Sequence, residues 1–165
     1  MTVEPIELQA AFRTAMARVC TPVSVVTTVE DGRPHGTTVS AFVSLSMDPP
    51  MVLVSLDNGS DLLAMVRRTG TFGVNVLAAD QSAVALRFAG KGPDKFRGAD
   101  WSGECGAARL DGVAAWLACT VGQIVEGGDH QVLLGNVVAA EATEIEPLTY
   151  HARTFGTHLR HVKAS

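Results

Sequence analysis

Residues 36–56 read GTTVSAFVSLSMDPPMVLVSL, and this stretch decides the fold. It consists of two apolar runs, rich in residues that favour strands, on either side of Asp48-Pro49-Pro50. Proline cannot donate a hydrogen bond to a sheet ladder, so we expect this corner to end the first strand. The stretch therefore predicts a strand over 38–44 and a second over 51–56, the latter apolar enough to be buried on both faces.

Hydroxyl groups alternate with valines along the first of these strands. Thr37, Thr38, Ser40 and Ser44 are interleaved with Val39 and Val43. Successive side chains of a strand point to opposite faces, so the alternation predicts one polar face. Judged by propensity alone, that face points to solvent.

Strand and helix patterns alternate along the rest of the chain. Apolar residues recur at helical spacing after Pro5, and Asp31-Gly32 is typical of a hairpin turn. The expected elements are an amphipathic helix through Leu8, Phe12, Ala15, Met16 and Val19, strands over 23–29 and from Pro34, a helix between Ser60 and Gly70, a strand over 72–77, a helix over 80–88, a long loop with six glycines over 90–112, strands over 114–125 and 131–140, and an arm from Pro147.

This pattern favours a β architecture. Strands outnumber helices and their connections are hairpin-like, so we expect an antiparallel barrel with peripheral helices, formed as one domain by residues 1–165. No Gly-x-Gly-x-x-Gly follows a strand and no Walker sequence occurs, so neither common nucleotide-binding fold is supported.

Composition excludes several classes of partner. With 47% hydrophobic and 18% charged residues the chain is globular, and its apolar excess suggests a subunit interface. A net charge of −4 without a basic cluster argues against nucleic acid. No apolar run is long enough for a bilayer, and Glu4 and Glu7 stand where a signal peptide would be basic and then apolar, so we expect a cytoplasmic protein.

The cysteines and histidines do not suggest a metal site. Cys20, Cys105 and Cys119 are widely spaced and form no Cys-x-x-Cys pair, which is typical of reduced, partly buried thiols. The histidines outside the motifs described below, His35, His158 and His161, are scattered. We assign no metal.

Two short segments have both a structural and a functional interpretation. Ser60 precedes a helix, where it would cap the first free N–H groups, and the same groups could hold an anion. Gly127-Gly128-Asp129-His130 has the composition of a hairpin turn, but such a turn would also place His130 at a barrel mouth.

Several motifs occur in the order typical of one family. They are residues 36–56, FGVNVL at 72–77, RFAGK at 87–91, GGDH at 127–130 and YHARTF at 150–155. Together they span nearly the whole chain, which resembles the flavin reductase family. The resemblance implies a homodimeric, FMN-binding split β-barrel that oxidises NADH or NADPH and reduces FMN or FAD. It also implies that the reduced flavin diffuses to a separate monooxygenase.

The resemblance also implies roles for individual residues. His130 of the Gly-Asp-His turn would contact the nicotinamide nucleotide as the catalytic residue. The remaining candidates would bind the cofactors: Thr37, Thr38, Val39, Ser40, Ala41, Ser44, Ser55, Leu56, Asp57, Ser60, Asp61, Arg87, Phe88, Lys91, Tyr150, His151, Arg153 and Phe155. No general acid–base pair is expected, since hydride transfer is the chemistry of the cofactors. Two alternatives stay open, a pyridoxamine-phosphate-oxidase-like enzyme and a flavin-binding module without reductase activity.

Overall fold

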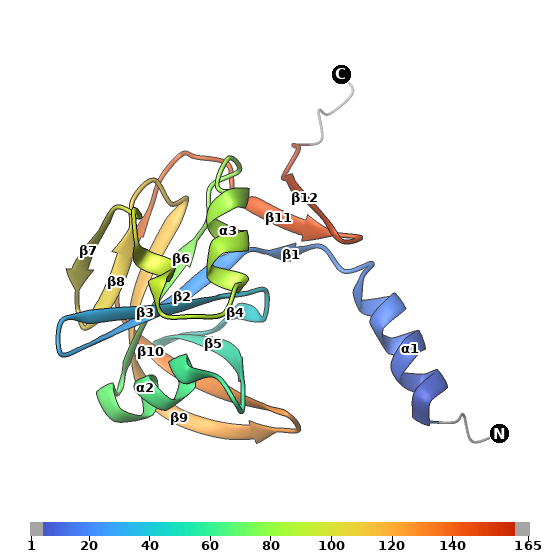
Figure 1. Cartoon of the computed structure of the whole chain (residues 1–165), viewed down its shortest axis with the longest axis horizontal. Coiled ribbons are helices and arrows are strands. Elements are labelled where there is room, and N and C mark those ends of the chain that lie inside the picture. The colour runs from blue at the N-terminus through green and yellow to red at the C-terminus, as the bar shows by residue number, and fades with distance from the viewer. Residues whose placement is uncertain (1–4, 161–165) are drawn as a thin grey trace.

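A seven-stranded antiparallel sheet forms the body of the protein (Figure 1), of which the computed structural model describes residues 5–160. Its strands lie in the order β3 (Arg33–Val39), β2 (Ser24–Glu30), β6 (Thr71–Val76), β9 (Ala115–Gly127), β10 (His130–Ala142), β5 (Pro50–Asp57) and β4 (Phe42–Met47). Three of the six pairings join consecutive strands through hairpins, the other three join strands that are distant in the sequence, and all six are antiparallel. The predicted mainly β architecture is confirmed.

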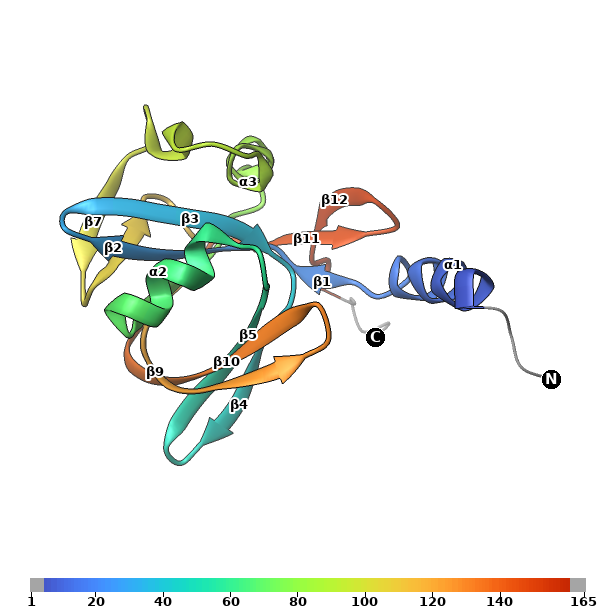
Figure 2. The same cartoon turned by 60° about the horizontal axis from the view of Figure 1, so that its bottom comes forward.

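The connection between β3 and β4 shows how the sheet closes. These consecutive strands lie at its two opposite edges, yet only Ser40 and Ala41 separate them. Two residues span a short distance, so the edges must approach each other and the sheet must curl. Figure 2 shows this curvature around the interior. The backbone N–H of Ser55 on β5 donates to the carbonyl of Ala41 at 3.0 Å, which fixes the crossing point.

Two sequence predictions for this region are wrong. The expected single strand over 38–44 is divided at Ser40-Ala41, because its first half pairs with β2 and its second half with β5. The strand over 51–56 is not buried on both faces: Val52, Val54 and Leu56 are buried, while the residues between them are half-exposed.

The core consists of two apolar clusters on opposite faces of the curled sheet. Val26, Val54 and Phe72 belong to one cluster, and Val25 and Trp116 belong to the other. The neighbours Val25 and Val26 point to opposite faces of β2, and both are completely buried. The inner strands are thus packed from both sides.

Two helices cover the sheet. Helix α2 (Asp61–Thr69) begins after Ser60 and ends at Gly70, whose φ of 70° gives the left-handed C-terminal conformation that glycine adopts readily. Helix α3 (Ser82–Ala89) packs on β3, where the Thr38 hydroxyl donates to the carbonyl of Ala85 at 2.7 Å. Both predicted helices are confirmed.

The predicted long loop over 90–112 is wrong. It contains a 3₁₀ turn, η1 (Asp94–Phe96), and a hairpin of β7 (Trp101–Glu104) and β8 (Ala107–Leu110). Buried polar side chains hold the hairpin: Thr27 donates to the carbonyl of Ala108 at 2.6 Å, and Asn75 bonds both this carbonyl and the N–H of Leu110. Glycine content alone gave no sign of these partners.

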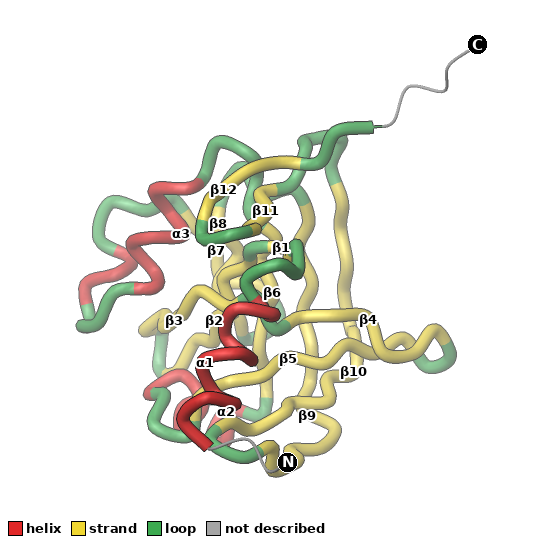
Figure 3. Tube along the Cα trace, turned by 90° about the vertical axis from the view of Figure 1, so that its right-hand side faces the viewer, coloured by secondary structure: helices red, strands yellow, loops and turns green. Residues whose placement is uncertain are grey.

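The first strand and the last two strands of the described chain pair at one side of the sheet. The strand β1 (Thr21–Pro22) pairs with β11 (Leu148–His151), which pairs with β12 (Thr154–Thr157), as Figure 3 shows. The predicted C-terminal arm is therefore a hairpin. Helix α1 (Pro5–Met16) projects away from the body (Figure 1), and its apolar residues Leu8 and Phe12 are exposed.

Candidate functional site

A hollow lies between β3 and the start of α2, and we call it the β3–α2 hollow. Its volume is about 480 Å³, and its walls include Thr37, Asp57, Ser60, Asp61 and Lys91, all of which the sequence singled out. The strand β3, the end of β5, the N-terminus of α2 and the segment after α3 supply these residues. His35 and Lys95 complete the polar lining.

Ser60 is the N-cap residue of α2. Its backbone is extended, with φ −71° and ψ 126°, and its hydroxyl accepts from the N–H of Leu63 at 3.5 Å. This capping hydrogen bond is long. The Ser60 hydroxyl and the first N–H groups of the helix therefore remain available to donate to another acceptor. Asp57 turns the chain toward the helix by accepting the N–H of Gly59 at 2.7 Å. This end of the hollow suits an anion such as a phosphate.

Lys95 supplies a cation that the sequence reasoning missed. Its ammonium donates to the carbonyls of Gly36 at 3.1 Å and Phe88 at 3.0 Å, which ties η1 to β3 and α3. An ammonium has three N–H groups, so one stays free while the group lines the hollow. Burial lowers the pKa of Lys95, which shows that the charge is partly removed from water. Within the Gly-rich segment this lysine had no distinguishing motif.

His35 is the second residue that sequence reasoning left aside. Burial lowers the pKa of its imidazole, the Lys95 charge lowers it further, and Asp61 opposes both. The ring is therefore neutral near pH 7, because its ordinary value is 6.5.

The His35 pKa predicts a pH dependence of stability. Unfolded protein takes up a proton near pH 6.5 while folded protein does not, so the free energy of unfolding should fall as pH drops below that value toward the lowered pKa. His35→Gln should reduce this fall. Urea unfolding of wild type and variant at about pH 7.5 and about pH 5.5 measures it. Equal losses of stability in the two proteins would show that His35 is not the cause of the pH dependence.

A second hollow, the β3–α3 hollow, adjoins the first at Ala89, which lines both. It measures about 380 Å³ and is lined by Thr38, Val39 and Ser40 together with Tyr150, Arg153 and Phe155 of the C-terminal hairpin, among others. The rings of Tyr150 and Phe155 lie 5.2 Å apart at 58°. Successive residues of β3 thus line two adjoining hollows, of which one has an anion-binding end and the other has an aromatic wall.

The turn between β9 and β10 stands at the rim of the β3–α2 hollow. His130 pairs with Asp57 across β10 and β5, and the N–H of Asn58 donates to the carbonyl of Asp129 at 3.0 Å. The Asn58 side chain also bonds Gly128 and accepts from Gln131. The turn is therefore fixed to the loop that starts α2.

His130 itself is oriented by its neighbour. Its Nδ1 lies 2.7 Å from the Asp129 carboxylate, and this hydrogen bond lowers the pKa of Asp129. With Nδ1 occupied, Nε2 is the ring nitrogen left for a ligand. The imidazole is 41% exposed, so a ligand can reach it.

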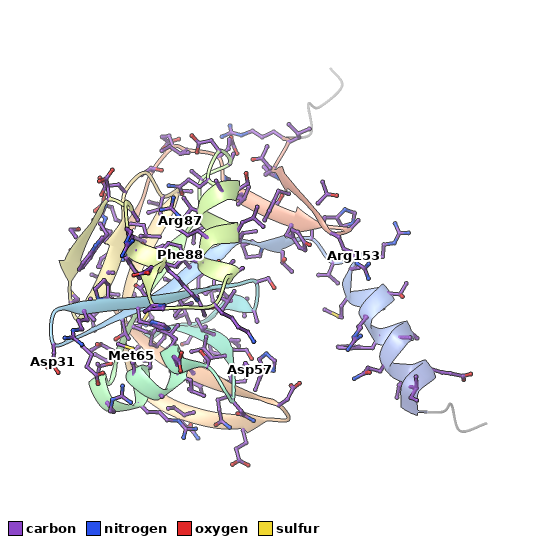
Figure 4. The ribbon with its side chains drawn as sticks, viewed as in Figure 1. Asp31, Asp57, Met65, Arg87, Phe88 and Arg153 are labelled. Atoms are coloured by element: carbon purple, nitrogen blue, oxygen red, sulfur yellow. The ribbon has the colours of Figure 1, made fainter. Side chains whose placement is uncertain are left out.

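The remaining predicted residues lie outside the walls of these two hollows. Phe88 is completely buried, with its ring 4.8 Å from that of Phe96, and the Leu56 side chain is likewise in the core. Arg87 is exposed on α3 next to Phe88 (Figure 4). Ala41, Ser44 and Ser55 follow the edge where β4 meets β5, and His151 lines a separate hollow near Cys20.

The described residues 5–160 contain no group of three or more His, Cys, Asp or Glu side chains that could hold a metal ion. His161 lies outside this range. The three cysteines are free, and burial raises the pKa of Cys119 to about 12. No helix of the described range is both long enough and apolar enough to cross a membrane.

The family model described as "Flavin reductase like domain" matches residues 16–158. The chain belongs to the flavin reductase family. A monooxygenase reductase subunit of Rhodococcus jostii, HsaB, is 39% identical over 142 residues, covering 85% of this chain and 73% of that protein. The NADH:riboflavin 5′-phosphate oxidoreductase of Streptomyces pristinaespiralis is 37% identical over 153 residues, covering 89% and 86%.

Solved structures of flavin reductases agree with the fold. Nitrilotriacetate monooxygenase component B of Mycobacterium thermoresistibile has a TM-score of 0.90 at 32% identity, covering 98% of this chain and 94% of that one. The NADH:FAD oxidoreductase SgcE6 of Streptomyces globisporus has a TM-score of 0.88 at 31% identity, covering 97% and 98%. The split β-barrel that the sequence resemblance implied is confirmed.

Proposed function

We propose that this flavin reductase oxidises NADH or NADPH and reduces FMN or FAD in the groove formed by the two hollows along β3. The observation that carries the assignment is that the groove has two different ends in a chain of this family. One end, with Ser60 and Lys95, suits an anion, and the other has an aromatic wall. A flavin has the matching shape, a phosphorylated tail joined to a flat ring with polar edges. Residues 1–165 act as one domain in this proposal, in the cytoplasm, where reduced nicotinamide is available.

A bound flavin would supply the redox chemistry by taking up a hydride from the reduced nicotinamide nucleotide, which would thereby be oxidised. The protein holds the two ring systems together and excludes water from them. Ser60, the α2 N–H groups and Lys95 bind the phosphate, while Thr37 to Ser40 supply hydroxyls and backbone groups for the ring edge. His130 orients the nicotinamide nucleotide from the rim.

Steady-state kinetics tests this function. Purified protein should oxidise NADH or NADPH only when FMN, FAD or riboflavin is added in excess, with saturation in both substrates. A protein that binds flavin and leaves both nucleotides unoxidised would be a flavin-binding module or an oxidase of another substrate, and the proposal would be wrong.

We expect His130→Ala to slow flavin reduction at low NADH, or to raise the KM for NADH, with FMN affinity almost unchanged. The physical reason is the position of Nε2, which is free while Asp129 holds Nδ1. Anaerobic stopped-flow reduction over a range of NADH concentrations measures it, with Gln123→Ala on the exposed part of β9 as the control. Superimposable curves for wild type and His130→Ala would show that this imidazole is an ordinary turn residue.

We also propose that the protein is a homodimer. Helix α1 leaves Ile6, Leu8 and Phe12 at least 60% exposed, far more than a helix with an apolar face tolerates in water. Val43 and Met47 on β4 are exposed as well, and a second copy could cover both surfaces.

The dimer predicts a specific effect of a charge on α1. Sedimentation should give twice the 17.3 kDa chain mass for the wild type, and Phe12→Asp should shift the protein to the monomer. Thr14→Asp, on the other side of the same helix, should stay dimeric. A monomeric wild type that still reduces flavin would refute the dimer and leave the reductase assignment in place.

The partner proposed for the reduced flavin is a separate monooxygenase. The Rhodococcus jostii relative and a 37% identical protein of Rhodococcus opacus are both named as reductase components of monooxygenases. Transfer by diffusion requires the reduced flavin to leave, which suits a groove that is open along β3.

A further inference from the structure

Asn58 joins the turn that carries His130 to the loop that leads into α2. Its backbone N–H donates to the carbonyl of Asp129 at 3.0 Å, and its side-chain Nδ2 donates to the carbonyl of Gly128 at 3.2 Å. Outside the strand ladders, the hydrogen bonds that tie residues 127–131 to the rest of the described chain all involve Asn58. One residue therefore fixes the β9–β10 turn to the start of the helix.

The Asn58 side chain faces this turn and not the β3–α2 hollow. Asp57 (labelled in Figure 4) and Gly59, on either side of it, line that hollow, whereas Asn58 does not. The Asn58 Oδ1 accepts from Nε2 of Gln131 at 2.9 Å, while Nδ2 donates to the Gly128 carbonyl. A carbonyl can only accept, so these two partners set the orientation of the amide. Both ends of the side chain are thus used within the protein.

The β9–β10 turn has few other supports. It is exposed, and a Cβ added at Gly128 would have no neighbouring atom within 4 Å. Gln131 is only 8% exposed, so its amide needs the acceptor that Asn58 provides. A shift of the turn would carry Asp129 with it, and the Asp129 carboxylate lies 2.7 Å from Nδ1 of His130. The place of the imidazole therefore depends on Asn58.

We propose that Asn58 is a positioning residue for nucleotide oxidation, which holds the His130 imidazole at a fixed place relative to the flavin. The contacts run from Asn58 to the backbone of Asp129, and from the Asp129 carboxylate to His130. Ser60, at the anion-binding end, follows Asn58 by two residues, so one short loop sets the place of both the flavin and the nucleotide contact. This inference rests on the proposed flavin reductase function, and it names how the same site places its nucleotide contact.

Anaerobic stopped-flow reduction of FMN by NADH tests the proposal in Asn58→Ala. Loss of the two side-chain hydrogen bonds frees the turn, so the NADH concentration that gives half the maximal rate should rise on the order of threefold to tenfold, the factor expected for a lost hydrogen bond. The Kd for FMN should stay unchanged, because this side chain does not line the hollow.

Gln81→Ala is the matched control. The Gln81 amide also joins two loops, accepting from the N–H of Ala78 at 2.9 Å and donating to the carbonyl of Asp111 at 2.8 Å. It lines neither hollow of the groove, so its loss should leave both the NADH dependence and the FMN affinity as in wild type.

A double-mutant cycle distinguishes positioning from a general structural effect. If Asn58 acts through His130, Asn58→Ala should have no further effect on the NADH dependence in a protein that already carries His130→Ala. The double variant should therefore match His130→Ala alone. Additive effects of the two changes would show that Asn58 acts by another route, and would overturn the inference.

The other outcomes separate this inference from the function on which it rests. An NADH dependence of Asn58→Ala equal to that of wild type would overturn the inference and leave the reductase assignment intact. A wild type that oxidises neither nucleotide with any flavin would overturn both. If Asn58→Ala does not fold, Gln131→Met replaces it, since it removes the donor to Asn58 Oδ1. The proposal then requires a higher NADH requirement that disappears in the His130→Ala background.

Discussion

Replacing Lys95 with methionine is expected to weaken FMN binding by on the order of tenfold or more, with a much smaller effect on riboflavin, which has no phosphate. A hydrogen bond to a charged group contributes about 1.5–3 kcal/mol, and the contribution is greater where the charge is partly removed from water. The lowered pKa of Lys95 shows such desolvation. Methionine keeps most of the apolar stem and removes only the ammonium.

Titration with the two flavins measures the Lys95 effect. Lys91→Met is the control, because Lys91 lines the same hollow but is exposed, and we expect a smaller loss of FMN affinity. Lys95 also bonds the carbonyls of Gly36 and Phe88, so thermal melts must show that the variant is folded. Equal weakening of FMN and riboflavin would show that Lys95 only holds η1 in place and does not bind the phosphate.

Gly135→Ala is expected to destabilise the fold by about 1–3 kcal/mol, the usual cost of overpacking a core. An added Cβ at this position would lie 2.8 Å from Cε1 of Phe72 and 3.1 Å from Cβ of Cys119. Phe72 and Cys119 are completely buried, so neither can move aside cheaply. Gly135 also lies at an irregularity of the sheet, because the β9–β10 register shifts between Leu134 and Gly135.

Urea unfolding measures the Gly135→Ala effect. Gly103→Ala on the exposed strand β7 is the control, since its added Cβ would have nothing nearer than the Trp101 ring at 3.9 Å. The control should stay within about 0.5 kcal/mol of wild type. A Gly135→Ala protein as stable as the control would mean that the core around Phe72 has room that the structure does not show.

The elements that could be predicted from sequence are those whose signals are local. Ser60 and Gly70 mark the ends of α2, and Asp31-Gly32 marks the β2–β3 turn, because caps and tight turns depend on the residues that form them. The division of the strand at Ser40-Ala41 depends instead on which strands pair with each half. Long-range pairing has no local signal, so the division was missed.

The residues of the candidate site also fall into those with a local signal in the sequence and those without one. Ser60 and Asp57 could be singled out because they surround a helix start, and they do line the β3–α2 hollow. His35 and Lys95 could not, because their importance comes from a strand and a 3₁₀ turn that meet only in the folded chain. Phe88 shows the opposite case: a motif residue whose side chain belongs to the core.

A crystal structure of the protein with bound FMN tests the central claim most directly, since that claim is the position of the flavin along β3. The account predicts phosphate density within hydrogen-bonding distance of the Ser60 hydroxyl and the Lys95 ammonium, with the ring beside the segment from Thr37 to Ala41. Phosphate density at Arg153, with the β3–α2 hollow filled by solvent, would contradict it.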